Sequence, residues 1–177
     1  AAPMNSVSKT EPTILCLGDS LTAGFGVAES SAYPARLQKR LEQLGIPHQV
    51  INAGVSGDTT AGAFRRTSWL LRHSDYKLAI VTLGANDGLR GLSLEQMESN
   101  LTKIILRLRE NKIQVILGGM RLPPNYGTEY VQGFAAVYPR LAQRFKLPLI
   151  PFFLQGVAGI PAHNLDDGIH PTSLGYQ

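Results

Sequence analysis

The sequence has little of several features that would assign it to a function class. It has one cysteine, Cys16, in 177 residues, so an intrachain disulfide framework is excluded. No apolar run approaches the length of a membrane-spanning helix, so stable membrane insertion is not expected. Charged residues make up only 17% of the chain, and no block of Lys and Arg is longer than Arg65-Arg66, which argues against nucleic-acid binding. The net charge of +4 is most simply a solvated surface, although it would also suit anionic substrates or membrane surfaces.

Motifs for cofactors and metals are also missing. No P-loop or G-x-G-x-x-G follows the first apolar run, and no set of His, Cys, Asp and Glu has metal-ligand spacing, so we expect neither cofactor nor metal. The nucleophile elbow G-x-S-x-G is absent, because Gly54-Val55-Ser56-Gly57 has its second glycine one position early. This argues against an ordinary α/β-hydrolase. Cys16 lies inside an apolar run and is predicted to be a small core residue rather than a thiol nucleophile.

The sequence does contain a regular alternation of apolar runs and helix-period segments. With 44% hydrophobic residues, a chain of this length can bury a core as one domain. The runs are continuously apolar, as in strands that are buried on both faces. They cover residues 13–17, 49–53, 78–83, 114–118 and 147–151. The order predicts an α/β fold, a three-layer α/β/α sandwich around a five-stranded parallel sheet. Residues 1–12 are predicted to be a flexible arm before a single domain at 13–177.

The segments between the runs predict helices with recognisable ends. One helix runs from Tyr33 and stops at Gly45, and a weaker one covers 59–73. Ser93 starts a capping box with Gln96 before an apolar stripe. A further stripe covers 131–145, and Pro139 inside it should kink or interrupt that helix.

Polar side chains follow the predicted strands in four loops. Each loop alone could be only a turn or a helix cap. In a parallel sheet, however, these loops meet at the carboxyl edge, where ligands bind. The loops are Gly18-Asp19-Ser20, Val55-Ser56-Gly57-Asp58-Thr59, Gly84-Ala85-Asn86-Asp87-Gly88 and Asp167-Gly168-Ile169-His170-Pro171.

These loops contain the parts of a hydrolase. Ser20 is a weak nucleophile unless a base takes its proton, and His170 is the one histidine of four with a carboxylate, Asp167, three residues before it. The backbone N–H groups of Ser20 and Gly57 and the side-chain amide of Asn86 are candidate donors to an oxyanion. The predicted catalytic residues are therefore Ser20, Asp167 and His170.

Substrate contacts are predicted from two longer loops, 119–129 and 152–170, which leave the same sheet edge. Their apolar side chains favour an acyl-chain groove, although part of the set could equally be core. Asp19 is expected to brace its loop rather than react. The candidate substrate-binding residues are Asp19, Leu122, Pro123, Tyr126 and Phe153.

The four loops resemble the sequence blocks of the GDSL or SGNH hydrolases, with Ser20, Gly57, Asn86 and His170 at the four lettered positions. Ser-Gly-Asp-Thr, Arg-Leu-Pro-Pro-Asn-Tyr-Gly and Asp-Asp-Gly-Ile-His-Pro look like the bacterial thioesterase I, lysophospholipase and arylesterase group. The resemblance implies a flavodoxin-like fold with strand order 2-1-3-4-5, no cofactor, and the triad and oxyanion hole at the residues above. It also implies a periplasmic or secreted location, which the start at Ala1-Ala2-Pro3 would fit after signal-peptide cleavage, and movement of 119–129 over bound acyl chains.

The sequence departs from the family pattern at one end. The final helix of the family should follow His170-Pro171, but the sequence stops at Gln177, so it is either truncated or lacks that helix. Without the helix, an apolar face of the sheet would be uncovered, and a partner or a second copy could cover it. We expect a monomer or a weak homo-oligomer.

The function that these observations favour is a serine hydrolase that cleaves carboxylic esters through an acyl-serine intermediate. Acyl thioesters and lysophospholipids are further candidate substrates, so the expected partner is a small acyl ester or thioester. A carbohydrate O-acetyl esterase would share the machinery and is the alternative enzyme. A non-catalytic acyl- or carbohydrate-binding module on the same fold is the alternative from another class. A flavodoxin-like nucleotide site is disfavoured, because Asp19 would repel a phosphate.

Overall fold

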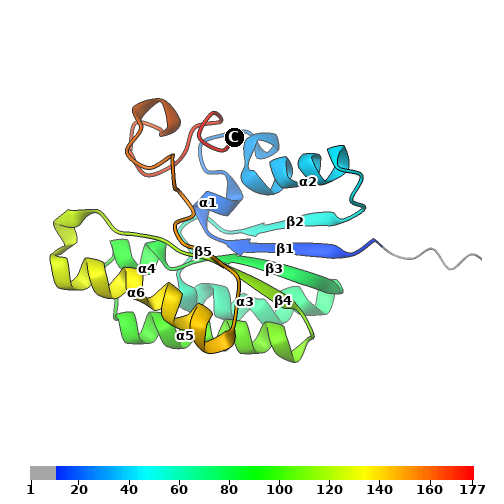
Figure 1. Ribbon diagram of the computed structural model, residues 1–177, viewed down its shortest axis with the longest axis horizontal. Helices are drawn as coiled ribbons and strands as arrows, with labels where there is room; N and C mark the ends of the chain where they lie inside the picture. The colour runs from blue at the N-terminus through cyan, green and yellow to red at the C-terminus, as the bar shows by residue number, and fades with distance from the viewer. Residues whose placement is uncertain (1–10) are drawn as a thin grey trace, which may run out of the picture.

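The polypeptide folds around a sheet of five strands in the order β2-β1-β3-β4-β5, and every paired neighbour is parallel (Figure 1). This confirms the expected fold class and strand order. The computed structural model describes residues 11–177, so the expected arm at 1–12 lies outside the described residues except for Glu11 and Pro12. The strands are β1 (Thr13–Gly18), β2 (Gln49–Gly54), β3 (Tyr76–Thr82), β4 (Gln114–Gly118) and β5 (Leu149–Ile150). The α-helices are α1 (Ser20–Ala23), α2 (Tyr33–Gln43), α3 (Thr60–His73), α4 (Ala85–Leu89), α5 (Leu94–Glu110) and α6 (Thr128–Phe145).

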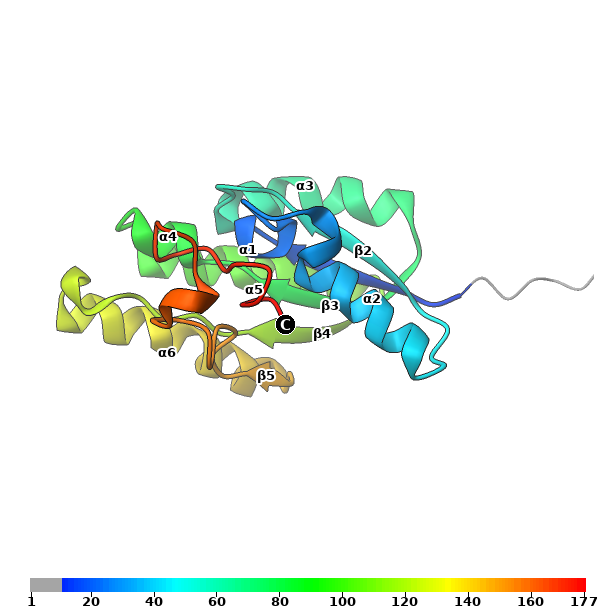
Figure 2. The same cartoon turned by 90° about the horizontal axis from the view of Figure 1, so that it is seen from above.

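The helices lie in two layers around the sheet. Figure 1 shows α3, α5 and α6 on one face and α2 on the other, and Figure 2 shows α2 over the side of the sheet where β1 and β2 pair. Short 3-10 helices at Glu29–Ser31, Pro124–Tyr126 and Pro161–His163 lie in the connections. No helix within residues 11–177 has the length and apolar character needed to cross a membrane.

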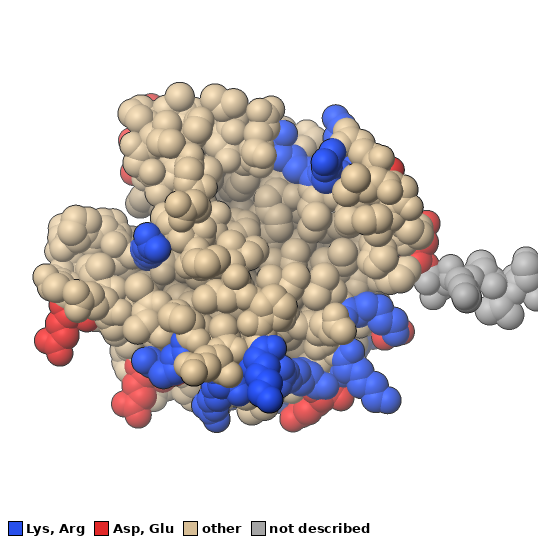
Figure 3. All heavy atoms as spheres, in the orientation of Figure 1, with Lys and Arg blue, Asp and Glu red and all other residues tan. Residues whose placement is uncertain are grey.

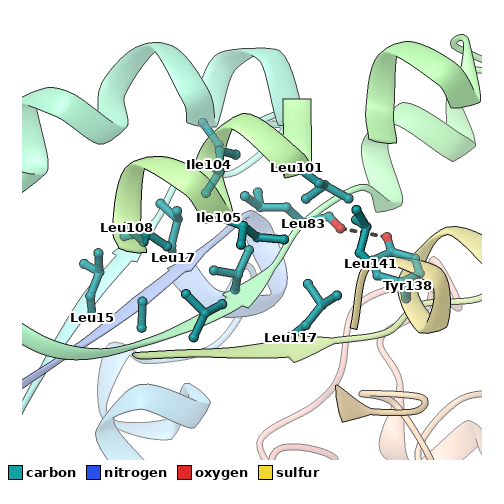
Figure 4. Packing of buried hydrophobic residues seen from close by; sticks show 14 of the residues in the cluster. Leu15, Leu17, Leu83, Leu101, Ile104, Ile105, Leu108, Leu117, Tyr138 and Leu141 are labelled. Carbon is teal, nitrogen blue, oxygen red and sulfur yellow. Dashed lines mark hydrogen bonds between the residues drawn. The ribbon is translucent and has the colours of Figure 1, made fainter. Parts of the chain in front are cut away.

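The main core lies between the sheet and α5 (Figure 4). Leu15 and Leu17 alternate with Ile14 and Cys16 along β1, and all four are buried, because helices lie on both sides of this central strand. Burial of each large aliphatic side chain stabilises the fold by about 1.5–3 kcal/mol. The side chains of α5 that face this core are fully buried at Leu101, Ile104, Ile105 and Leu108.

The free Cys16 is buried, and burial raises the pKa of its thiol to about 11. A thiol with this pKa is protonated at neutral pH and is a poor nucleophile. The prediction of a core cysteine is confirmed.

Two helix ends lie where the sequence predicts them, and two other expectations about helices differ from the structure. Gly45 has a φ of 70° after α2, and the Ser93 hydroxyl accepts the Gln96 N–H at the start of α5. Of the two effects expected of Pro139, the interruption is wrong, because α6 continues through that residue, and the kink stays a prediction. The loop expected around Asn86 is instead the short helix α4, which begins after Gly84 at a φ of 113°.

The fifth strand is shorter than the predicted run of 147–151. Only Leu149 and Ile150 pair with β4, and prolines stand on both sides of them, at 148 and 151. Proline has no N–H to donate to a sheet, so the pairing ends there. Residues 151–177 then pass the carboxyl edge of the sheet in turns (Figure 1).

The face of the sheet beside α2 is covered unevenly. Leu78, Ile80 and Ile116 on this face are half-buried, and Ile150 is exposed. Within residues 11–177, no helix packs over β4 and β5 on this side (Figure 1).

Candidate active site

Ser20 lies where β1 ends and the four-residue helix α1 begins. The preceding Asp19 is the N-cap, and its Oδ1 accepts the Leu21 N–H at 3.0 Å. This cap fixes the turn from strand to helix and leaves Ser20 at the first helical position. The Ser20 Oγ is 2.9 Å from Nε2 of His170, 150 residues later in the sequence.

His170 is held by Asp167 through a tight turn. Gly168 has a φ of 67°, and Oδ1 of Asp167 accepts the backbone N–H groups of Ile169 at 2.8 Å and His170 at 3.0 Å. Oδ2 of Asp167 is 2.5 Å from Nδ1 of His170. The Phe25 ring lies against the imidazole, with 4.5 Å between the ring centroids. The three predicted catalytic side chains therefore form one hydrogen-bonded chain, as expected.

The charge of Asp167 determines which nitrogen of the His170 ring carries the proton. The hydrogen bonds from the backbone and side chain of His170, together with the one from Ile169, lower the pKa of Asp167 to about 2. An ionised Asp167 accepts from Nδ1–H, so the neutral ring has its lone pair on Nε2, facing the Ser20 hydroxyl. This is the tautomer that can take a proton from the serine.

The candidate oxyanion donors lie on the neighbouring loops. Gly57 follows β2 with a φ of 80°, a conformation that favours glycine. Among residues 11–177, no acceptor takes a hydrogen bond from the backbone N–H of Ser20 or of Gly57. Unpaired backbone donors of this kind are available to a ligand oxygen. Asn86, on α4, donates from Nδ2 to the Asp58 carbonyl at 2.9 Å, and its second amide hydrogen is left for another acceptor.

Side chains brace these two loops against each other. The buried carboxylate of Asp87 accepts from the backbone N–H of Thr60 at 2.9 Å and from its hydroxyl at 2.7 Å. Asn100, on α5, donates to the same hydroxyl at 3.2 Å. The exposed Arg90 donates to the Gly57 carbonyl at 2.8 Å. Asp87 and Arg90 therefore fix the loop after β2 to the helix that carries Asn86.

The predicted substrate residue Asp19 is buried and bonded to its own helix. Burial raises the pKa of its carboxyl to about 6, although the Leu21 N–H and the nearby His170 lower it. These contacts agree with a bracing role, and its contact with substrate stays a prediction.

The other four candidate residues lie in different surroundings. Leu122 is buried, and Tyr126 donates its hydroxyl to the Leu89 carbonyl at 2.9 Å, beside the helix that carries Asn86. Pro123 is exposed. The Phe153 ring packs edge-on against Tyr33, 5.0 Å between centroids, on the α2 side of the sheet. Tyr126 also lines an open hollow of about 570 Å³ between residues 126–130 and Leu94.

Sequence reasoning missed three residues around the site. They are Phe25, which packs against the His170 ring, and two arginines that donate hydrogen bonds, Arg90 to Gly57 and Arg66 to Asp58. These contacts join segments that are separated in the sequence. Their residue types carry no motif, so only the assembled fold reveals them. Within residues 11–177, no cluster of three or more His, Cys, Asp and Glu side chains is placed to hold a metal ion.

The sheet order and the chain Asp167–His170–Ser20 define an α/β protein with a serine–histidine–aspartate triad at the carboxyl edge of its sheet. Residues 16–177 match the GDSL-like lipase/acylhydrolase family. The chain belongs to this family.

Characterised relatives cover most of the chain. Esterase TesA of Pseudomonas aeruginosa is 43% identical over 160 residues, which are 90% of this chain and 80% of that protein. Thioesterase 1/protease 1/lysophospholipase L1 of Escherichia coli is 41% identical over 90% of this chain and 76% of that protein. Among solved structures, the SGNH-hydrolase family esterase AlinE4 superposes with a TM-score of 0.86 at 45% identity, covering 94% of this chain and 89% of that one.

Proposed function

We propose that this protein is a serine hydrolase that cleaves carboxylic esters and acyl thioesters through an acyl-Ser20 intermediate. The observation that carries the proposal is the hydrogen-bonded chain from Asp167 through His170 to Ser20, 2.5 Å and 2.9 Å long at its two links. A serine paired in this way has a base within reach and an anion to stabilise the protonated base.

Acylation follows from these contacts. Oγ of Ser20 attacks the acyl carbonyl carbon while Nε2 of His170 takes the hydroxyl proton, and Asp167 stabilises the imidazolium that forms. The carbonyl oxygen becomes an oxyanion, which accepts from the N–H groups of Ser20 and Gly57 and from Asn86. The C–O or C–S bond to the leaving group then breaks, and His170 donates its proton to the departing oxygen or sulfur.

Deacylation repeats the same steps with water. His170 takes a proton from the water as its oxygen attacks the acyl carbon, and the same three donors bind the second oxyanion. The bond to Oγ breaks, the proton returns to Ser20, and the carboxylic acid leaves.

An uncharged acyl substrate fits the segment that carries Asp167 and His170 past the site. Residues 151–177, which pass this edge of the sheet, contain no lysine or arginine and only two acidic residues, Asp166 and Asp167. In Figure 3 most of the blue side chains gather along the lower edge, on the side of α3, α5 and α6, and others lie over α2 at the upper right and at the left. The named activities of the relatives, esterase and thioesterase, also favour acyl esters and thioesters over the alternative of carbohydrate O-acetyl groups.

The test is hydrolysis of p-nitrophenyl esters from acetyl to palmitoyl and of an acyl-coenzyme A series, with Ser20→Ala beside the parent. We expect turnover by the parent, none by Ser20→Ala, and an acyl adduct on Ser20 in mass spectra of the quenched reaction. Ser74→Ala is the matched control, because Ser74 is exposed at the far end of α3. A folded Ser20→Ala protein with parental turnover would contradict the proposal, and activity confined to acetyl esters would favour an acetyl esterase.

A further inference from the structure

Arg66 joins two of the loops that carry the site. It lies on α3, and its Nε donates to Oδ2 of Asp58 at 2.8 Å, in the loop after β2. Its Nη2 donates at 2.9 Å to the carbonyl of Gly18, the last residue of β1. One planar guanidinium therefore spans the end of the strand that leads into Ser20 and the loop that presents Gly57.

Asp58 extends this connection to the third loop. Its backbone carbonyl accepts a hydrogen bond from Nδ2 of Asn86, and Asp58 is bonded directly to Gly57 in the sequence. The Gly18 carbonyl also accepts the backbone N–H of Val55 at 3.1 Å, at the start of the same loop. The groups expected to bind the oxyanion are thus linked through Arg66 and Asp58 without a break.

The local sequence leaves room for this pair. Gly62 lies in the first turn of α3, and a Cβ placed there would be 2.0 Å from Oδ1 of Asp58. Glycine is a poor helix residue, so its presence inside α3 has a cost in stability. The space it leaves holds the Asp58 carboxylate beside Arg66.

Burial restricts the geometry of the ion pair between Arg66 and Asp58. The side chains are 21% exposed for Arg66 and 12% for Asp58, so water competes weakly for their hydrogen bonds. Partly buried ion pairs add little net stability, because the attraction only offsets the cost of removing both charges from water. The two hydrogen bonds of the Arg66 guanidinium, to Asp58 and to the Gly18 carbonyl, do fix distances, and arginine provides this fixed fork where lysine does not.

We propose that Arg66 and Asp58 are positioning residues, which hold Ser20, the Gly57 N–H and the Asn86 amide in the register that binds the oxyanion. This inference rests on the proposed function. Neither residue needs to touch the substrate. Their effect is on the transition state, because the oxyanion exists there and not in the bound ester.

The first test compares Arg66→Met and Arg66→Lys with the parent in steady-state ester hydrolysis, well below the Tm of each protein. Loss of one oxyanion donor typically lowers kcat by about 100- to 1,000-fold, and a displaced donor should cost less. We expect kcat to fall by roughly 10- to 100-fold in Arg66→Met, with KM changed less than about threefold. Arg66→Lys should recover part of kcat, because an ammonium can reach Asp58 but does not span both acceptors.

Arg140→Met is the matched control. Arg140 makes a 2.7 Å ion pair with Glu98 between α6 and α5, and this pair does not contact the four loops. Its loss should leave kcat and KM at parental values. A merely structural role for Arg66 would lower the Tm while kcat stayed parental, and that result would overturn the inference.

Gly62→Ala tests the same point without removing a polar group, and it decides the matter if Arg66→Met does not fold. The new methyl group must displace the Asp58 carboxylate from Arg66. We expect kcat to fall several-fold at unchanged KM, and parental kcat in this variant would contradict the inference. A parent without Ser20-dependent turnover would overturn the proposed function as well, whereas an active, Ser20-dependent parent with unaffected variants would overturn this inference alone.

Discussion

Asp19 should make the stability of the fold depend on pH in a way that Asp19→Asn removes. Its carboxyl is 2% exposed, and burial raises its pKa from the usual 3.8 to about 6. Two charged groups influence it, since His170 lowers this pKa and Asp58 raises it, and Asp19 in turn helps to raise the pKa of Tyr176. Asparagine keeps the oxygen that accepts the Leu21 N–H, so the cap of α1 survives the change.

The size of the effect follows from the two pKa values. From about pH 4 to about pH 6, the folded protein keeps a proton on Asp19 that the unfolded chain has released. The free energy of unfolding therefore falls as pH rises through this window, and it levels off above about pH 6. A rise from 3.8 to about 6, at about 1.4 kcal/mol for each pKa unit, corresponds to about 3 kcal/mol.

The assay is urea unfolding of the parent and Asp19→Asn at several pH values from about 4 to about 8. Subtracting the two free energies cancels the titration of all other groups that behave alike in both proteins. The variant should gain about 2.5 kcal/mol on the parent between the ends of this range, because at about pH 4 the unfolded chain has released the Asp19 proton only in part. Asp75→Asn is the control for the aspartate-to-asparagine change itself, because the side chain of Asp75 is 86% exposed. A flat difference for Asp19→Asn would refute the assigned role of burial.

Three further substitutions test other contacts. Asp167→Asn should lower kcat by roughly 1,000- to 10,000-fold, because asparagine favours the wrong imidazole tautomer of His170. Steady-state kinetics would show the loss while circular dichroism stays unchanged, and a parental kcat would contradict the prediction. Asn86→Ala should lower kcat by about 100- to 1,000-fold with a similar KM, whereas a rise in KM alone would assign Asn86 to substrate binding. Tyr138→Phe removes the buried hydroxyl that donates to the Leu83 carbonyl at 2.7 Å (Figure 4). Urea unfolding should show that the free energy of unfolding falls by about 1–3 kcal/mol. An equally stable variant would be evidence against the contribution of this hydrogen bond.

The sequence was informative wherever a rule of backbone topology applied. Continuous apolar runs predicted a sheet buried on both faces, and parallel strands bring their carboxyl ends to one edge. Ser20 and His170 could therefore be predicted to meet although 150 residues separate them. The spacing of Asp167 and His170 was enough to predict their contact, because a single turn spans it.

Features that depend on tertiary contacts could not be predicted. Asn-Asp-Gly in the third loop is typical of a turn, but the burial of Asp87 and its bonds to Thr60 favour the helix α4. Pro139 follows about three turns of α6 and is tolerated, since the apolar face of that helix is packed on the sheet. The periplasmic or secreted location and the oligomeric state stay predictions.

The two halves of the site are held by different means, and this separates their roles. The loops of Ser20, Gly57 and Asn86 are tied to one another by Asp87, Arg66 and hydrogen bonds to backbone carbonyls. The segment of Asp167 and His170 contacts other parts of the chain through Arg36, which donates to the Ser173 carbonyl at 2.8 Å, and through the Phe25 ring, which lies against His170. Oxyanion binding requires donors that do not reorganise, whereas in the proposed reaction His170 serves the Ser20 hydroxyl, the leaving group and water in turn. A donor set braced by several hydrogen bonds suits the first demand, and an imidazole held at Nδ1 by Asp167 with Nε2 facing Ser20 suits the second.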